Sequence, residues 1–337
     1  MTIRLVVAFA LLAVASYLPA ASTSPLRIET SIEAMGGSFD IIAYGPDQNV
    51  LRAATEAAGD EIKRIETVMS NYIPTSEWSE INRGSASAPV RVSAETIEVL
   101  KACKRYHELS GGTFDITVGP LMKVWGFYKG TGRLPHRAEV RTALTRVGSD
   151  KILIEDDGVR FARTGMEIDP GGIGKGYAVD RAVDVLKQYG IRSALVSAAR
   201  SSIYAMGTPP NNPEGWSVNI RDPKDSKKVA QKVLLRDQSM STSGNYEKFF
   251  FANGKMYSHI MDPRTGYPAQ GMLSVSVIAP RCMDSEAWTK PIYIQGRAWA
   301  EQHKPQGFRA FVCEDKSVGF RGPFGTQGET ESCAWLR

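Results

Sequence analysis

Cysteine is scarce in this sequence, and no two cysteines are spaced as a redox or zinc-binding pair. The four are Cys103, Cys282, Cys313 and Cys333, and none belongs to a Cys-x-x-Cys motif. The spacing therefore argues against a zinc knuckle and against a thioredoxin-like site. Two alternatives remain: four unpaired thiols, or a disulfide between Cys313 and Cys333, which would fasten the C-terminal tail in an oxidising compartment.

The sequence also lacks an apolar run long enough to cross a bilayer. The apolar stretch at residues 5–18 is shorter than the roughly 20 residues that a transmembrane helix needs. Arg4 precedes it and small residues follow at 20–22, which predicts a cleaved signal peptide over residues 1–22. An uncleaved N-terminal anchor is the alternative. No cysteine follows the stretch to carry a lipid, so we expect an exported, periplasmic protein with no stable membrane anchor.

Basic runs with interleaved aromatic residues are absent too. The chain has 41 Lys and Arg against 36 Asp and Glu, and its formal net charge of +5 falls to +4 when Arg4 leaves with the signal peptide. This excess is spread along the sequence, which argues against a nucleic-acid-binding protein. It is compatible with a polyanionic small ligand such as a dinucleotide.

What is present is a mixture of strand and helix patterns. Alternating apolar residues predict strands, and apolar residues at helical spacing predict helices that end at glycines. The strands are expected at 26–32, 39–44, 193–197, 217–220, 273–277 and 308–313, and the helices at 49–69, from Ser93 to Gly111, and at 176–189. The two types do not alternate regularly and no linker or repeat separates them, so we expect one α+β globular domain. The Gly-rich tail from Gly319 is expected to be loop.

Two glycine-rich segments suit ligand binding. Gly111-Gly112 allows backbone conformations that other residues avoid, and it precedes Thr113-Phe114-Asp115, so an aromatic ring and a carboxylate are expected just after a turn. The alternative is a helix stop followed by a buried strand. The second segment, 169–180, is a glycine-rich turn that opens a helix, where backbone N–H groups and the helix dipole attract anions and Lys175 adds a cation. It matches neither the Walker A motif nor the Rossmann fingerprint.

Two further segments concentrate polar residues in turns. One is Thr242-Ser-Gly-Asn-Tyr246. The other is the stretch 259–268, which combines His259, Asp262, Arg264 and Thr265 within ten residues. Asp-Pro and Thr-Gly pairs explain the turns. They do not explain the histidine and the arginine, although a lone histidine is as often structural as catalytic.

Taken together and in this order, these segments resemble the FAD:protein FMN transferase family, the thiamine-biosynthesis-lipoprotein-like flavin transferases. The similarity begins at Met35-Gly-Gly-Ser-Phe39, includes Met69-Ser-Asn-Tyr72 and Ser79-Glu-Ile-Asn82, and ends near Gly296. Each motif is weak alone, but several in order are specific. The resemblance implies a T-fold-like architecture over residues 25–337.

The resemblance also implies the reaction and its residues. The enzymes of this family split the pyrophosphate of FAD, attach FMN to a Thr or Ser hydroxyl of a partner protein, and release AMP, with Mg²⁺ bound near the phosphates. Such a site needs cations for the pyrophosphate and a base for the hydroxyl. Carried over by position, the FAD-binding residues are Met35, Tyr72, Thr113, Phe114, Asp115, Asp169, Lys175, His259 and Ile260. His259 is also a candidate catalytic residue, and the Gly172 backbone is expected near the metal.

One segment departs from the family pattern, which supplies the other metal ligands from Ala-Asp-x-x-x-Thr. A gapped alignment puts Asp284 and Thr289 at those positions, as oxygen ligands for Mg²⁺ with Asp284 as the base. An ungapped alignment from Gly296 puts Glu286 and Lys290 there instead. That pair has the spacing of a helical ion pair, and its ammonium would repel Mg²⁺. Pro291 disfavours helical geometry at the preceding residue, so both alignments stay open.

A second departure lies at 198–202, where the family has a Gly-Gly-Asp-like turn. Arg200 either reaches a phosphate or lies on the surface, and we expect the surface. FMN transfer from FAD, with Mg²⁺ at Gly172, Asp284 and Thr289, is the leading hypothesis. The alternatives are an FAD-binding protein without transferase activity, in which Lys290 replaces the metal, and a hydrolase that converts FAD to FMN and AMP.

Overall fold

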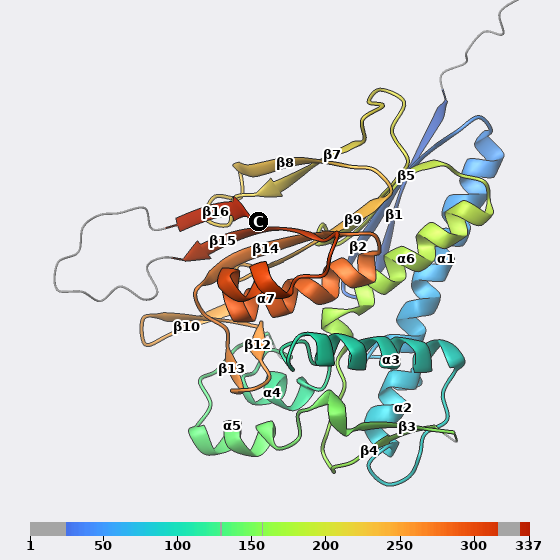
Figure 1. Cartoon of the computed structure of the whole chain (residues 1–337). Helices are drawn as coiled ribbons and strands as arrows, with labels where there is room; N and C mark the ends of the chain where they lie inside the picture. Colours follow the sequence, from blue (N-terminus) through green and yellow to red (C-terminus); the bar gives the residue numbers. More distant parts are fainter. Residues whose placement is uncertain (1–24, 129, 157, 316–330) are drawn as a thin grey trace, which may run out of the picture.

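An antiparallel sheet of eight strands forms the centre of the molecule (Figure 1). The computed structural model describes residues 25–128, 130–156, 158–315 and 331–337, so the expected signal peptide lies outside the described residues. The strands in sheet order are β1 (Leu26–Ala34), β2 (Gly37–Gly45), β5 (Ser193–Ala198), β6 (Ser202–Met206), β9 (Gln238–Gly244), β14 (Met272–Ala279), β15 (Arg309–Asp315) and β16 (Glu331–Trp335). Strands β1 and β2 form a hairpin whose turn includes Met35, a residue with φ of +51°.

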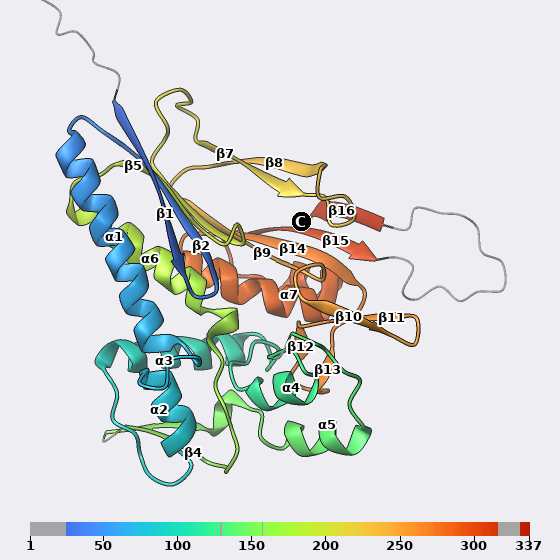
Figure 2. The same ribbon diagram turned by 180° about the vertical axis from the view of Figure 1, so that it is seen from behind.

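Three helices cover one face of this sheet: α1 (Gln48–Met69), α6 (Gly174–Gln188) and α7 (Cys282–His303) (Figures 1 and 2). In α1 the fully buried residues Leu51, Ala58, Ile62 and Ile65 recur at helical spacing and face the sheet. Asp47 caps this helix, because its carboxylate accepts hydrogen bonds from two first-turn N–H groups. The apolar faces of the helices and the sheet make one continuous core.

The opposite face of the sheet is covered by a hairpin of β7 (Trp216–Arg221) and β8 (Val229–Leu235). Along β7 the buried residues Trp216, Val218 and Ile220 alternate with exposed ones, as in a strand with one solvated face. They pack with Phe311 and other sheet residues in a second apolar core. Strand β14 is packed against other elements on both faces of the sheet, so all of its residues are buried.

A smaller layer of helices and hairpins lies beyond α6 and α7 (Figure 2). Its elements are α2 (Glu77–Gly84), α3 (Ala94–Leu109), α4 (Gly119–Val124), α5 (Arg137–Leu144), the 3₁₀ turns η1 (Ser149–Lys151) and η2 (Pro170–Gly172), and the strand pairs β3–β4 (Ile152–Glu155, Gly158–Phe161), β10–β11 (Phe249–Ala252, Lys255–Ser258) and β12–β13 (Met261–Asp262, Tyr267–Pro268). As expected, Ser93 caps α3, where its hydroxyl accepts from the Thr96 N–H. The loops of this layer meet α7 at the candidate site.

The expected α+β class is confirmed, whereas two segments differ from expectation. No element was assigned to 282–303, and Pro291 disfavours helical geometry at the preceding residue, yet α7 runs through this proline and breaks only at Gly296, where φ is 81°. Packing of α7 on β9 and β14 outweighs the local penalty of the proline. Residues 331–335 form β16 instead of loop, and the rest of the Gly-rich tail lies outside the described residues. Within the described ranges no helix is long and apolar enough to span a bilayer.

Of the two alternatives left open for the cysteines, the disulfide between Cys313 and Cys333 is the one present, and it joins two directly opposed residues of β15 and β16. Cys103 and Cys282 are free and buried. The disulfide closes a loop with a sequence separation of 20 residues and holds the last strand on the edge of the sheet.

We expect the double variant Cys313→Ser, Cys333→Ser to lose about 3 kcal/mol of unfolding free energy, because closing a loop of this length restricts the unfolded chain. Urea unfolding followed by circular dichroism measures the loss. Wild-type protein in reducing agent should match the variant, and equal midpoints for oxidised and reduced wild type would contradict the prediction.

Candidate functional site

One cavity lies where the loops of the small layer meet α6, α7 and the end of β9. Its volume is about 130 Å³. The lining residues come from all four glycine-rich and polar segments, and they are Thr113, Phe114, Asp115, Ile116, Val118, Met122, Asp169, Gly171, Gly172, Lys175, Ser201, Ser202, Thr242, Ser243, Gly244, Glu247, His259, Ile260, Met261, Glu286 and Lys290. Residues far apart in sequence thus converge on one site.

The turn after α3 is built by hydrogen bonds, and its aromatic ring and carboxylate are buried rather than displayed. Ser110 Oγ accepts from the Phe114 N–H at 2.9 Å, and the Phe114 ring packs edge-on against Tyr106. The side chain of Asp115 is only 1% exposed. Its carboxylate accepts from Ser149 Oγ and the Ser149 N–H, both at 2.9 Å, and from His107 Nδ1 at 3.1 Å. Asp115 therefore holds in place the turn after α3, which lines the cavity.

Burial alone would raise the pKa of Asp115, but hydrogen bonds from His107 and Thr117 outweigh it and lower the pKa. The same hydrogen bond to Asp115 raises the pKa of His107 above its usual value. When His107 is protonated, it forms an ion pair with the buried carboxylate of Asp115.

The glycine-rich turn of η2 and α6 provides a carboxylate and a cation, and its helix terminus is capped from within the protein. Asp169 accepts from the Gly171 N–H at 2.7 Å and from the Tyr128 hydroxyl. Lys175, on the first turn of α6, lines the cavity. The next residue, Gly176, donates its N–H to the Glu286 carboxylate of α7.

Glycine is required at 176, since a Cβ there would lie 2.5 Å from the carbonyl oxygen of Cys282 and 2.9 Å from Glu286. The expected anion site at the start of α6 is thus partly filled by the carboxylate of Glu286.

His259 directly follows β11 and also lines the cavity. Its Nδ1 is 3.2 Å from the carbonyl oxygen of Lys248, and because a carbonyl only accepts, Nδ1 carries the proton and Nε2 of the neutral ring is an acceptor. Burial lowers the pKa of His259 to about 4, so the ring is neutral at pH 7. Arg264 does not line the cavity and pairs with Asp262 at 3.0 Å.

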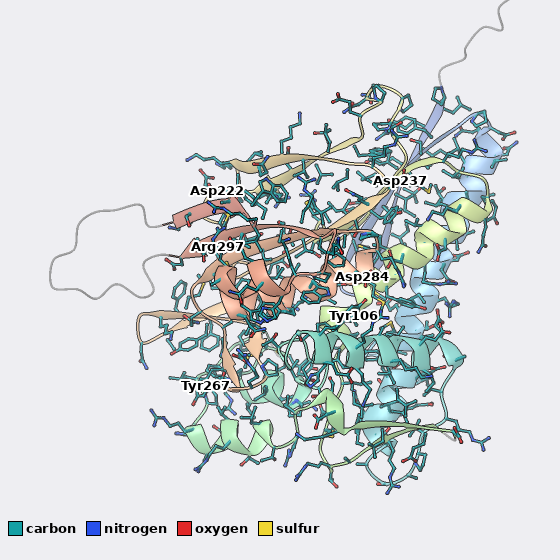
Figure 3. All side chains as sticks on the ribbon, in the orientation of Figure 1. Tyr106, Asp222, Asp237, Tyr267, Asp284 and Arg297 are labelled. Carbon is teal, nitrogen blue, oxygen red and sulfur yellow. A yellow bond between two sulfur atoms is a disulfide. The ribbon has the colours of Figure 1, made fainter. Side chains whose placement is uncertain are left out.

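The structure brings Glu286 and Lys290 to the cavity, and it places Asp284 and Thr289 outside the lining. Asp284 accepts a hydrogen bond from the Tyr106 hydroxyl, between α7 and α3 (Figure 3). Thr289 is fully buried; its hydroxyl donates to the Glu286 carbonyl and also bonds the Ser243 hydroxyl, both at 2.7 Å. Residues five apart on a helix point about 140° away from each other, so Asp284 and Thr289 cannot face one ion.

Comparisons with known proteins identify the family of this chain. The sequence pattern of the ApbE family matches residues 35–312. This chain belongs to the ApbE family. It is 32% identical over 262 residues to the FAD:protein FMN transferase of Treponema pallidum, which covers 73% of this chain and 72% of that protein. It is 30% identical over 238 residues to that of Klebsiella pneumoniae, covering 69% and 72%.

Solved structures show the same fold. The ApbE protein of Thermotoga maritima superposes with a TM-score of 0.79 at 31% identity, covering 86% of this chain and 94% of that one. The flavinyl transferase ApbE of Pseudomonas stutzeri, in its apo form, gives 0.77 at 25% identity, with 93% and 96% covered. The family resemblance inferred from the sequence motifs is confirmed.

In this ApbE-family chain seven of the nine predicted FAD-binding residues line the cavity. The other two lie apart. Met35 is half-buried, with its N–H bonded to Glu66, and Tyr72 is 75% exposed in a neighbouring groove with Tyr128 and Lys123. Because Tyr128 also bonds Asp169, the groove adjoins the cavity.

Sequence reasoning missed Tyr128, Glu247 and the pair Ser201-Ser202. Glu247 directly follows the 242–246 segment, and the serines lie in the segment that departs from the family, whereas none of the segments named above pointed to Tyr128. Arg200 is exposed and does not line the cavity, as expected.

The residues present do not fit the Mg²⁺ that the resemblance implied. The Glu286 carboxylate is engaged by Gly176, and Lys290 places a cation against Gly172, where a Cβ added to the glycine would be 3.6 Å from Lys290 Cε. Burial lowers the pKa of Lys290 to about 8, partly offset by Glu286, so its charge persists at neutral pH.

Among the described residues no three His, Cys, Asp or Glu side chains gather to hold a metal. The assignment of Asp284 and Thr289 as ligands, and of Asp284 as the base, does not fit this arrangement.

The His107–Asp115 pair makes a pH-dependent prediction. Because the folded pKa of His107 is raised, its stabilisation is fully present below its unfolded pKa near 6.5 and is lost as pH rises through the folded value. We expect His107→Gln to cost about 1.5–3 kcal/mol near pH 5.5 and clearly less near pH 9. Thermal unfolding at both pH values measures the difference in unfolding free energy between wild type and His107→Gln, with the exposed His303→Gln as control. A difference that does not change with pH would refute the ion pair.

Proposed function

We propose that this chain transfers FMN from FAD to a Thr or Ser hydroxyl of an exported partner protein and releases AMP. One observation carries the proposal: Lys175 and Lys290, from different helices, converge with the neutral His259 on one cavity. The relatives named FAD:protein FMN transferase support the same reaction. The signal-peptide pattern in the sequence supports action in the periplasm.

The charge distribution suits a pyrophosphate. The two lysines face its negative charge. The hydroxyls of Thr113 and Ser201 already donate to the carbonyls of Ser110 and Ala198, so the lysines supply the main phosphate contacts. The enclosed volume of about 130 Å³ is smaller than a whole dinucleotide needs, so we place only part of FAD inside. The adjoining groove of Tyr72 and Tyr128 is the proposed path for the remainder.

In the transfer step the acceptor oxygen forms a bond to the FMN phosphorus, and the bond from that phosphorus to the bridging oxygen breaks. AMP leaves with the bridging oxygen. His259 Nε2 is the proposed acceptor of the hydroxyl proton, which then passes to solvent, because the neutral imidazole keeps a lone pair at pH 7. The lysines hold the phosphates during this exchange.

The test is a flavinylation assay on the mature chain with FAD, Mg²⁺ and an acceptor domain that carries a target Thr. We expect flavin fluorescence on the acceptor after denaturing electrophoresis, and AMP in equal amount. Release of AMP without flavin on the acceptor would favour the FAD hydrolase instead. Bound FAD with neither AMP nor a labelled acceptor would favour a binding protein.

We expect His259→Asn to slow transfer by about 10²–10⁴-fold while FAD affinity changes little, because a general base acts in the chemical step. The matched control is His303→Asn, an exposed histidine that is not part of the cavity lining. Transfer at the wild-type rate in His259→Asn would remove this residue from the mechanism.

A further inference from the structure

Lys290 occupies the position at which the ungapped family alignment has a metal-binding hydroxyl. It lies four residues after Glu286 on α7, and its Nζ donates to the Glu286 carbonyl oxygen at 3.0 Å. Its stem lies against η2, since a Cβ on Gly172 would be 3.6 Å from Lys290 Cε. The ammonium is thus held at the backbone that the resemblance placed beside the metal.

The groups around this ammonium leave it available for an anion. Glu286 is buried, and its carboxylate accepts from the Gly176 N–H rather than from Lys290 Nζ in the hydrogen bonds described. Asp115 accepts hydrogen bonds from His107 and Ser149, and Asp169 accepts from Tyr128 and Gly171. The Glu247 carboxylate also lines the cavity and is the remaining acidic neighbour of Lys290. An ammonium has three N–H donors, of which one points to the Glu286 carbonyl, so two can reach phosphate oxygens.

We propose that Lys290 takes the place of the divalent cation in this chain, binding the pyrophosphate of FAD so that FAD binding and transfer of FMN need no Mg²⁺. The inference rests on the proposed function for the identity of the ligand. A tethered ammonium differs from Mg²⁺ because it is always present and cannot be removed by a chelator. It also excludes a second cation from the same place by repulsion.

The first experiment needs no variant. FAD binding to the mature wild-type chain is titrated by quenching of flavin fluorescence, once in EDTA and once in excess Mg²⁺. We expect dissociation constants within about twofold of each other, since a tenfold difference would already correspond to about 1.4 kcal/mol from a bound ion. A tenfold or larger loss of affinity in EDTA would overturn the proposal.

The second experiment exchanges the cation for a metal ligand. In EDTA, Lys290→Thr should bind FAD at least tenfold more weakly than wild type, and Mg²⁺ should restore binding. Lys290→Met keeps the length of the stem without charge or ligand, so Mg²⁺ should not restore it. The control is Lys187→Met, an exposed lysine on α6 that is not among the cavity residues. If Lys290→Met binds FAD as tightly as wild type, the proposal is wrong.

Direct metal binding gives a readout independent of FAD. Mn²⁺ titrated into the protein alone, followed by its electron paramagnetic resonance signal, should stay free with wild type and become bound with Lys290→Thr. A bound Mn²⁺ in wild type that Lys290→Thr does not strengthen would overturn the inference.

Failure of this inference and failure of the proposed function are distinguishable. Binding of FAD and labelling of the acceptor only with Mg²⁺ would refute the role of Lys290 and leave the transferase intact. No FAD binding under either condition would refute both. Labelling that continues in EDTA supports both.

Discussion

The hydrogen bond from the Gly176 N–H to the Glu286 carboxylate is the contact on which the site depends. It joins the first turn of α6 to α7, and it satisfies a helix N-terminus with a carboxylate from inside the protein. The approach is close enough that residue 176 has to be glycine. With Glu286 held there, the next turn of α7 brings Lys290 to the cavity and to Gly172.

The opposite wall depends on buried charge. Asp115 would be unstable in its buried position without His107, Ser149 and Thr117, which supply donors to both carboxylate oxygens. This network holds the Thr113–Phe114 turn against the cavity. Lys175, His259 and Lys290 thus lie beside carboxylates that are already hydrogen-bonded, namely those of Asp115, Asp169 and Glu286, while Glu247 also lines the cavity.

Much of the frame could be predicted because its signals are local. Ser93 capping α3, the helical spacing of Ile62 and Ile65, and the alternation along β7 depend on residues a few positions apart. Helix α7 could not be predicted from the sequence, because Pro291 signals a break in a helix. Only the packing of α7 on β9 and β14 outweighs the penalty of this proline. The burial of Asp115 was one of two alternatives left open by the sequence, since its partners His107 and Ser149 are distant in sequence or separated from it by a turn.

The sequence by itself determined the family, the order of the motifs and most of the residues that line the cavity, because these depend on residue identities at fixed spacings. It left two alignments of the metal segment open, since Asp284 with Thr289 offers oxygen ligands for Mg²⁺ and Glu286 with Lys290 offers an ion pair in its place. Only the tertiary structure decided which of them meet the cavity. On an unbroken helical turn, residues four apart share a face while Asp284 points away toward Tyr106, and that direction is set by how α7 packs between the sheet and α3.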